Sequence, residues 1–469
     1  MLRADRSLAL VIGLLALLLA YGFYNGLVQS QARTDIVTTV QQAEANSASA
    51  LIGRLSRIEA GEETPGLLNN PANPATVGNS AGRQAVLHDV ALAPIAIGQS
   101  DMMPNYYRIN TRSKVEFMYD SEIESPWNLL SGHFDLSFVI VFLLPLLIFA
   151  LTFNLLSAER ESGTERMLLS QPLSVTVLAV GKLLPRAISV LAVASMAPVL
   201  LLLVFHPEAR SGQAGPLLGW IGIVVAYGAF WFALALAVNS LRLPSSANAL
   251  ILIASWTVLV LVVPVLLNLL VERLHPSPSR TELSIQTRAI QAENLRRYDD
   301  LFSGDFRYIE DPEALQTKDG RIEIPPRTMA SFLARRDMDA RVDSLLDAFD
   351  NSQMQQQEAV DRLSFLSPAV LAYEGLTRIA GTDGQRYLTY RQEVSAFHDR
   401  WRAHFEPLIL NGIAMDEADL QQLPQWETPD SLRLYASTFV VEWRVILLAL
   451  ATAAVALVSF WNLRRYKVA

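Results

Sequence analysis

The chain contains no cysteine among its 469 residues, and this absence removes several classes of function at once. Without cysteine there is no disulfide, no thiolate metal site and no cysteine nucleophile. Charged residues are also scarce, at 18% of the chain, against about 25% in ordinary soluble domains. The formal net charge of −8 gives no electrostatic support for nucleic-acid binding. We therefore expect no nucleic-acid partner.

The usual catalytic and metal-binding patterns are missing as well. There is no GxxxxGK[ST] phosphate-binding loop, and the nearest fragment, Val180-Gly181-Lys182-Leu183, lacks the preceding glycine and the hydroxyl residue. None of the histidines has the HExxH spacing or a paired-ligand pattern, and GxSxG is absent. We expect a chain that is not an enzyme, does not hydrolyse ATP itself and binds no metal or other cofactor.

What the chain does have is long apolar runs. Hydrophobic residues make up 51% of the sequence and are concentrated rather than spread. A helix needs about 20 mainly apolar residues to cross a bilayer. The sequence thus predicts an all-α membrane protein with six transmembrane helices, at residues 7–28, 134–156, 175–205, 217–238, 249–271 and 445–462.

The basic residues near the span ends predict the orientation, because cytoplasmic loops carry an excess of lysine and arginine. They share one face of the membrane if both termini are cytoplasmic. A multi-pass protein of a bacterial inner (plasma) membrane is the natural interpretation. The residues are Arg3, Arg6, Arg160, Arg166, Lys182, Arg186, Arg242, Arg464, Arg465 and Lys467.

The first span has an alternative interpretation. Ser30-Gln31-Ala32 resembles a signal-peptidase site, with small residues at its first and third positions. The apolar run is longer than a typical signal sequence, however, and its removal would break the even number of spans. We therefore expect a retained anchor.

Span parity then places two large segments outside the cytoplasm. The first should begin as a helix and continue as a loop over 64–82, with short strands or extended crossings at 92–97 and 106–119. The second is mostly helical by its apolar spacing. We expect one mainly helical, periplasmic domain built from both inserts. The predicted division of the chain is 1–28 (N-terminus and first span), 29–133 (first insert), 134–271 (spans two to five with a loop at 157–172), 272–442 (second insert) and 443–469 (sixth span and C-terminus).

Few polar residues lie at membrane depth, where they are costly and often functional. Asn154, Asn239 and Asn268 lie near span ends, where hydration at the membrane interface is the simplest explanation. No aspartate or glutamate lies in the middle of a span, which argues against a proton- or ion-driven carrier. Asp135, at the outer start of the second span, is the closest exception, and it could equally cap that helix.

The loop after the second span combines alternating charges with an apolar end. We expect a short helix along the membrane interface, with its charges facing solvent and the Met-Leu-Leu group packed inward. Gly163 allows a tight turn, and Pro172 marks the start of the next element. A solvated turn whose charges only enforce topology is an equally good interpretation. The residues concerned are Glu159, Arg160, Glu161, Glu165, Arg166, Met167, Leu168 and Leu169.

The same loop resembles the type-2 ABC transporter permeases, in the subgroup that has large extracytoplasmic inserts and is grouped with the permeases named for multi-copper enzyme maturation. A second similar block runs over 125–135 and includes Gly132, Phe134 and Asp135. The pair Glu165-Arg166 departs from the family pattern, which more often has apolar residues there. The matching loop residues are Glu159, Glu161, Gly163, Thr164, Leu168, Leu169, Ser170, Gln171 and Pro172, followed by Gly181-Lys182-Leu183.

The resemblance implies a half-transporter. Two permease chains, identical or paralogous, would form the membrane unit, and two cytoplasmic ABC ATPase subunits carrying ATP and Mg would bind beneath it. Gly132, Phe134 and Asp135 would lie at the outer start of the second span. The alternative function is a membrane-anchored extracytoplasmic binding or sensory protein without transport. The residues expected to couple the permease to the ATPase are Glu159, Glu161, Gly163, Thr164, Leu168, Leu169 and Pro172.

Overall fold

A computed structural model describes residues 6–67, 69–119, 134–170, 174–207, 213–277, 279–297, 312–433 and 443–465. Within these residues the protein is an all-α membrane protein, as predicted. Its six helices that are long and apolar enough to cross a membrane are Arg6–Glu59, Leu136–Glu161, Val175–Phe205, Ala214–Asn239, Ser245–Leu274 and Trp443–Arg464.

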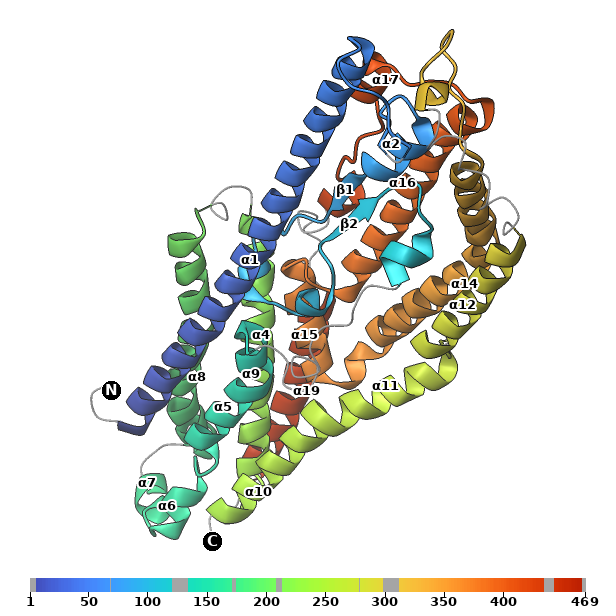
Figure 1. Cartoon of the computed structure of the whole chain (residues 1–469). Coiled ribbons are helices and arrows are strands. Elements are labelled where there is room, and N and C mark those ends of the chain that lie inside the picture. Colours follow the sequence, from blue (N-terminus) through green and yellow to red (C-terminus); the bar gives the residue numbers. More distant parts are fainter. Residues whose placement is uncertain are drawn as a thin grey trace.

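The first helix, α1 (Arg6–Glu59), continues far beyond its span without a break. At 1.5 Å per residue its 54 residues extend about 80 Å, more than twice the hydrocarbon thickness of a bilayer. Figure 1 shows it running along almost the whole molecule. The helix predicted at the start of the first insert is thus the same helix as the first span.

Two other spans contain a π-helical segment that ends two residues before a proline. The second span is α4 (Leu136–Phe138), η4 (Val139–Leu143) and α5 (Leu144–Thr152), with Pro145 near the start of α5. The fifth is α10 (Ser245–Trp256), η6 (Thr257–Val262) and α11 (Val263–Leu274), with Pro264 near the start of α11. Proline cannot donate to the preceding turn and clashes with its carbonyl, and the wider π turn relieves both problems.

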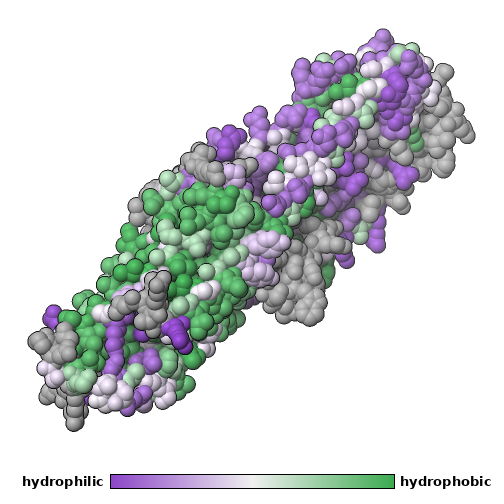
Figure 2. Space-filling view, turned by 90° about the vertical axis from the view of Figure 1, so that its left-hand side faces the viewer, coloured by the Kyte–Doolittle hydropathy of each residue, from purple (hydrophilic) through white to green (hydrophobic). Residues whose placement is uncertain are grey.

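The fourth span, α9 (Ala214–Asn239), lies at the centre of the bundle. It packs against α8 (Val175–Phe205), α19 (Trp443–Arg464), α5 and α10. Its Trp220, Tyr227 and Trp231 are fully buried. Surface hydropathy follows this architecture: Figure 2 shows apolar surface over the bundle and polar surface over the rest of the molecule.

The helices α6 (Ser157–Glu161) and α7 (Glu165–Leu169) connect the second span to the third. We call residues 157–170 the elbow. The elbow lies at the end of the bundle where α1 begins and α19 ends (Figure 1). The basic side chains that were predicted to share one side, such as Arg6, Arg160 and Arg464, belong to segments at this end.

The other end carries a mainly helical region, which we call the head domain: residues 34–119 and 275–433 as far as the structure describes them. Its small sheet pairs β1 (Arg83–Val86) with β2 (Tyr106–Ile109) in antiparallel register, Arg83 opposite Ile109. The remaining elements are α2 (Pro74–Ser80), η1 (Ala93–Ile95), η2 (Ser100–Met102), η3 (Val115–Tyr119), α12 (Arg280–Arg297), η8 (Pro312–Leu315), α14 (Pro326–Leu363), η9 (Ser364–Leu366), α15 (Pro368–Ile379), α16 (Gly384–Asn411), α17 (Glu417–Gln421) and α18 (Asp430–Arg433).

The short strands were predicted only in part. The segment 106–109 is a strand, but 93–95 forms a 3-10 turn, and the partner strand at 83–86 was missed. The stretch 64–82, predicted as loop, contains the helix α2, because Asn73 caps it and Pro74 presets its first turn. The aromatic stripe of α16 forms part of the domain core: Tyr390, Val394, Phe397, Trp401 and Phe405 are all buried.

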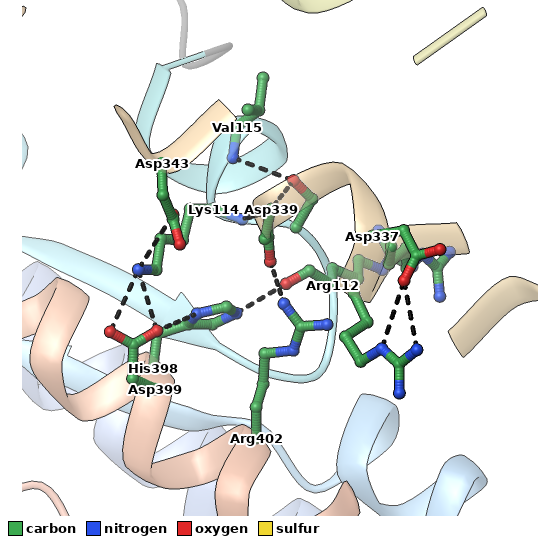
Figure 3. Close-up of polar contacts among 12 residues, drawn as sticks. Arg112, Lys114, Val115, Asp337, Asp339, Asp343, His398, Asp399 and Arg402 are labelled. Atoms are coloured by element: carbon green, nitrogen blue, oxygen red, sulfur yellow. Dashed lines mark hydrogen bonds and ion pairs between the residues drawn. The ribbon is translucent and has the colours of Figure 1, made fainter. Parts of the chain in front are cut away.

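A buried ionic cluster joins the two inserts within the head domain (Figure 3). Asp339 of α14 accepts hydrogen bonds from the Ser113 hydroxyl and, at 3.1 Å, from the Lys114 backbone N–H, and it pairs with Arg402 of α16. Lys114 Nζ lies 2.9 Å from an Asp399 oxygen. Burial raises the pKa of Asp339, and the Arg402 guanidinium opposes that rise. One acidic side chain thus connects segments more than 200 residues apart.

The head domain is anchored to the bundle through α15. This helix packs on α9, η6 and α19, and its Leu371 and Leu376 are buried in the same core as the spans. The Ser367 hydroxyl donates to the Leu259 carbonyl at 2.6 Å, within the π segment of the fifth span. Gly375 lies close to the fourth span: an added Cβ would be 2.6 Å from the Ile223 side chain, whose end would have to shift. The head domain is therefore packed directly on these spans.

Candidate functional site

The elbow is a pair of short helices closed by a left-handed glycine. Gly163 has φ of +75°, and nothing lies within 4 Å of an added Cβ, so glycine is needed for its conformation rather than for space. The Thr164 hydroxyl donates to the Glu159 carboxylate and lies 3.2 Å from the Glu159 carbonyl oxygen. The tight turn predicted at Gly163 is therefore present, and Thr164 and Glu159 fix its shape.

The charged side chains of α6 contact neighbouring spans. Glu159 Oε1 lies 2.6 Å from Lys182 Nζ of the third span. Glu161 accepts hydrogen bonds from the backbone N–H of Ser245 at 2.7 Å and from its hydroxyl at 2.9 Å, at the positive N-terminal end of α10. Arg160 donates to the Leu243 carbonyl. The elbow is thereby bonded to the third and fifth spans.

The expected orientation of the elbow is confirmed for Glu161, which is exposed, but it is wrong for Met167, Glu159 and Arg160. Its charges were expected to face solvent and its Met-Leu-Leu group to pack inward, yet Met167 is 70% exposed, Leu168 is half-buried, and Glu159 and Arg160 are bonded inward. The physical reason is that helix ends leave backbone groups unpaired. Neighbouring span ends meet at the elbow and offer such groups to charged side chains, which leaves the apolar Met167 outside.

The last turn of the second span is held by polar side chains from three other spans. Asn239 Nδ2 donates to the Thr152 carbonyl at 2.8 Å, and Asn239 Oδ1 accepts from the Leu156 N–H at 3.2 Å. Asn248 Nδ2 donates to the Phe153 carbonyl at 3.1 Å. Arg186 Nη1, from the third span, donates to the Leu151 carbonyl at 3.0 Å. The carbonyls that a helix end leaves open are thus satisfied by α8, α9 and α10.

The structure corrects the interpretation of one of the three asparagines. Asn239 is only 2% exposed and links spans rather than meeting interfacial water. Asn154 is half-buried and Asn268 is exposed. Sequence reasoning missed Asn248, which is fully buried, and Ser245. The sequence feature that could have identified them is this pair of polar residues at the start of the fifth span, shortly after Asn239 at the end of the fourth.

These contacts make the elbow a mechanical connection. The elbow is covalently continuous with the second and third spans and is hydrogen-bonded to the fifth. Asn239 connects the end of the second span to the fourth span. Hydrogen bonds from buried amides therefore join the end of the second span to the fourth and fifth spans. The exposed tip of the elbow, by contrast, is free to contact another molecule.

The predicted residues at the start of the second span have a structural role. Asp135 Oδ1 accepts from the Phe138 N–H at 2.7 Å, which makes it the helix cap, and Oδ2 accepts from the Ile97 N–H at 2.8 Å. The Phe134 carbonyl accepts from Asn25 Nδ2 of α1 at 2.9 Å. Asp135 thus connects the span to the head domain, and Phe134 connects it to α1.

Several predicted residues are not covered by the structural description. Gly132 and the rest of 125–133 lie outside the described residues, as do Gln171 and Pro172. For Leu169 only the helical backbone is described. Within the described part of the chain, no group of three or more histidine, aspartate or glutamate side chains gathers at a spacing that could hold a metal ion.

Comparison with known proteins gives one partial match. Residues 327–428, which include most of α14 and all of α15 and α16, match a family model described as a domain of unknown function, DUF3526. No curated protein sequence matches the chain. No solved structure matches it either.

Proposed function

We propose that this chain is the non-catalytic permease subunit of an ABC transporter, which moves a substrate across the bacterial inner membrane with energy from ATP hydrolysed by a separate ATPase subunit. The observation that carries the proposal is the elbow. It combines an exposed apolar tip at Met167 with buried polar connections from the adjoining helix end to the spans around it. A permease that receives its energy from outside needs such an element.

In this proposal the residues of the elbow have different roles. Met167 is the side chain that contacts the ATPase, because a flexible, exposed methionine adapts well to a partner's groove. Glu159, Thr164 and Gly163 keep the turn in shape, and Glu161 passes its displacement to the fifth span. Leu168, half-buried behind Met167, supports the tip.

The direction of insertion follows from the basic residues. The elbow, the start of α1 and the end of α19 are on the cytoplasmic side, because that end of the bundle carries Arg6, Arg160, Lys182 and Arg464. The head domain is then periplasmic. ATP and Mg bind to the partner ATPase and not to this chain.

A second permease chain, identical or paralogous, completes the membrane unit. Burial is uneven among the spans: 67% of the apolar window of α9 is buried, but only 17% of that of the fifth span and 11% of that of α19. The poorly covered spans leave apolar surface for lipid and for the second chain. The two chains can switch between two conformations, which open the substrate path to opposite sides of the membrane, only if their contacts with the ATPase differ between these conformations.

The test is affinity purification of the tagged protein from its native host in mild detergent, followed by mass spectrometry. We expect a P-loop ATPase in stoichiometric amount, its loss with Met167→Asp, and its retention with the conservative control Met167→Leu. Reproducible absence of any ATPase beside the intact wild-type protein would instead favour a membrane-anchored extracytoplasmic binding or sensory protein.

A further inference from the structure

The head domain contains a partly open cavity of about 550 Å³, between the first insert and the helices α11, α12, α14 and α16. This volume is within the range of about 300–1,000 Å³ that small-molecule sites occupy. In Figure 1, α11 and α12 follow one another along α14, which packs on both of them. The cavity therefore begins where the fifth span leaves the bundle and continues into the head domain.

One wall of the cavity is apolar. Val115 and Met118 contribute from η3, Leu283 from α12 and Phe349 from α14, and all four side chains are buried. Val271, close to the end of α11, extends this wall toward the membrane. Methionine and aromatic side chains give a surface that adapts to an apolar chain.

The opposite wall is polar and carries a positive charge. Arg391 of α16 is 3% exposed, and its guanidinium lies 4.6 Å from the centre of the Tyr119 ring. The hydroxyls of Tyr107 and Tyr387 form a hydrogen bond of 2.7 Å beside it. Among the lining residues that the structure describes, Arg391 is the only one with a charged side chain.

The guanidinium of Arg391 also has unused hydrogen-bonding capacity. Its Nη2 lies 3.0 Å from Asp350 Oδ1, a close charge contact. Nη2 is thus already paired, whereas Nε of Arg391 makes no hydrogen bond within the described residues. A buried donor without an acceptor is unfavourable. An anionic oxygen in the cavity would remove that cost.

We propose that this cavity binds a single-chain anionic amphiphile, an acyl chain with a carboxylate or phosphate head group. The head group accepts from Arg391, and the chain lies against Val115, Leu283 and Phe349. Entry is from the bilayer, since Asn268 and Val271 of the cavity wall belong to the helix that ends the fifth span. This assignment is independent of the proposed coupling to an ATPase, because it concerns binding by the purified chain alone.

The experiment uses the purified full-length protein in phosphatidylcholine nanodiscs and a photoreactive palmitate analogue that carries a diazirine. After illumination, mass spectrometry maps the labelled peptides. We expect label on peptides from η2 to η3 and from α12. Unlabelled palmitate and lysophosphatidylglycerol are compared as competitors, and the stronger one shows whether the site prefers a free fatty acid or a lipid. Hexadecanol, which has no charge, should compete poorly. Equal competition by hexadecanol overturns the anionic assignment.

Matched variants locate the site. Ser284 of α12 lines the cavity, whereas the neighbouring Ile285 is 65% exposed. Ser284→Trp should reduce labelling of the cavity peptides about tenfold, because the indole fills the space, and Ile285→Trp should leave it unchanged. The charge-neutral double variant Arg391→Gln with Asp350→Asn should reduce labelling about tenfold while the fold persists. Label confined to the spans, or equal in all variants, refutes the proposal.

Discussion

Replacement of Asn239 by alanine tests the connection between the second and fourth spans. The Asn239 side chain donates to the Thr152 carbonyl at 2.8 Å and accepts from the Leu156 N–H at 3.2 Å. In the alanine variant the Leu156 N–H loses this acceptor in a buried site, whereas the Thr152 carbonyl loses one donor and keeps the Leu155 N–H at 3.2 Å. Each such loss costs about 1–3 kcal/mol in protein interiors, but polar contacts between membrane helices average only about 0.6 kcal/mol.

We therefore expect Asn239→Ala to lower the free energy of unfolding by about 1–3 kcal/mol. The assay is unfolding of the purified protein in mixed micelles by increasing sodium dodecyl sulfate, followed by circular dichroism. The matched control is Asn154→Ala, which removes an amide near the same helix end. Asn154 is half-buried, and its side chain makes no hydrogen bond among the described residues. Equal effects of the two substitutions would refute the connecting role of Asn239.

Three further predictions concern other parts of the molecule. Gly163→Pro should abolish association with the ATPase without preventing membrane insertion, since proline cannot adopt φ of +75°. Co-purification measures the association, and membrane fractionation measures the insertion. Asp339→Ala should destabilise the head domain by about 3–5 kcal/mol, because Arg402 loses its buried partner; limited proteolysis and thermal melting would show it. Burial raises the pKa of Glu374 to about 7, so its contribution to stability is complete below the unfolded pKa and is lost as pH rises through 7. Glu374→Gln should therefore raise the melting temperature above pH 7 and have little effect near pH 4.

The spans could be predicted because they depend on one local property, about 20 apolar residues in a row. A similar use of residue patterns predicted the helix at the start of the first insert, which continues the first span within α1. It failed at β1 (Arg83–Val86), which is four residues long and has no clear alternation of apolar and polar side chains. Short elements of this kind depend on their partner strand, which lies 20 residues further along the chain.

The elbow shows a different limit of sequence reasoning. Its position, charges and glycine turn were visible in the sequence, but the direction of the side chains was not. That direction depends on which backbone groups the ends of other spans leave open, such as the carbonyls that Asn239 and Asn248 satisfy. The cavity was missed for a similar reason, since its lining residues come from segments between Gln99 and Arg391 that the fold brings together.

The central claim is that the tip of the elbow contacts an ATPase, and the absence of native cysteine allows a direct measurement. Met167→Cys is labelled with benzophenone maleimide in membranes of the native host and illuminated, and the cross-linked partner is identified by mass spectrometry. Ile285→Cys, exposed in the head domain, is the control. The account predicts a P-loop ATPase cross-linked through position 167 and not through position 285. An elbow that cross-links no ATPase, while the labelled protein is intact and abundant, would contradict it.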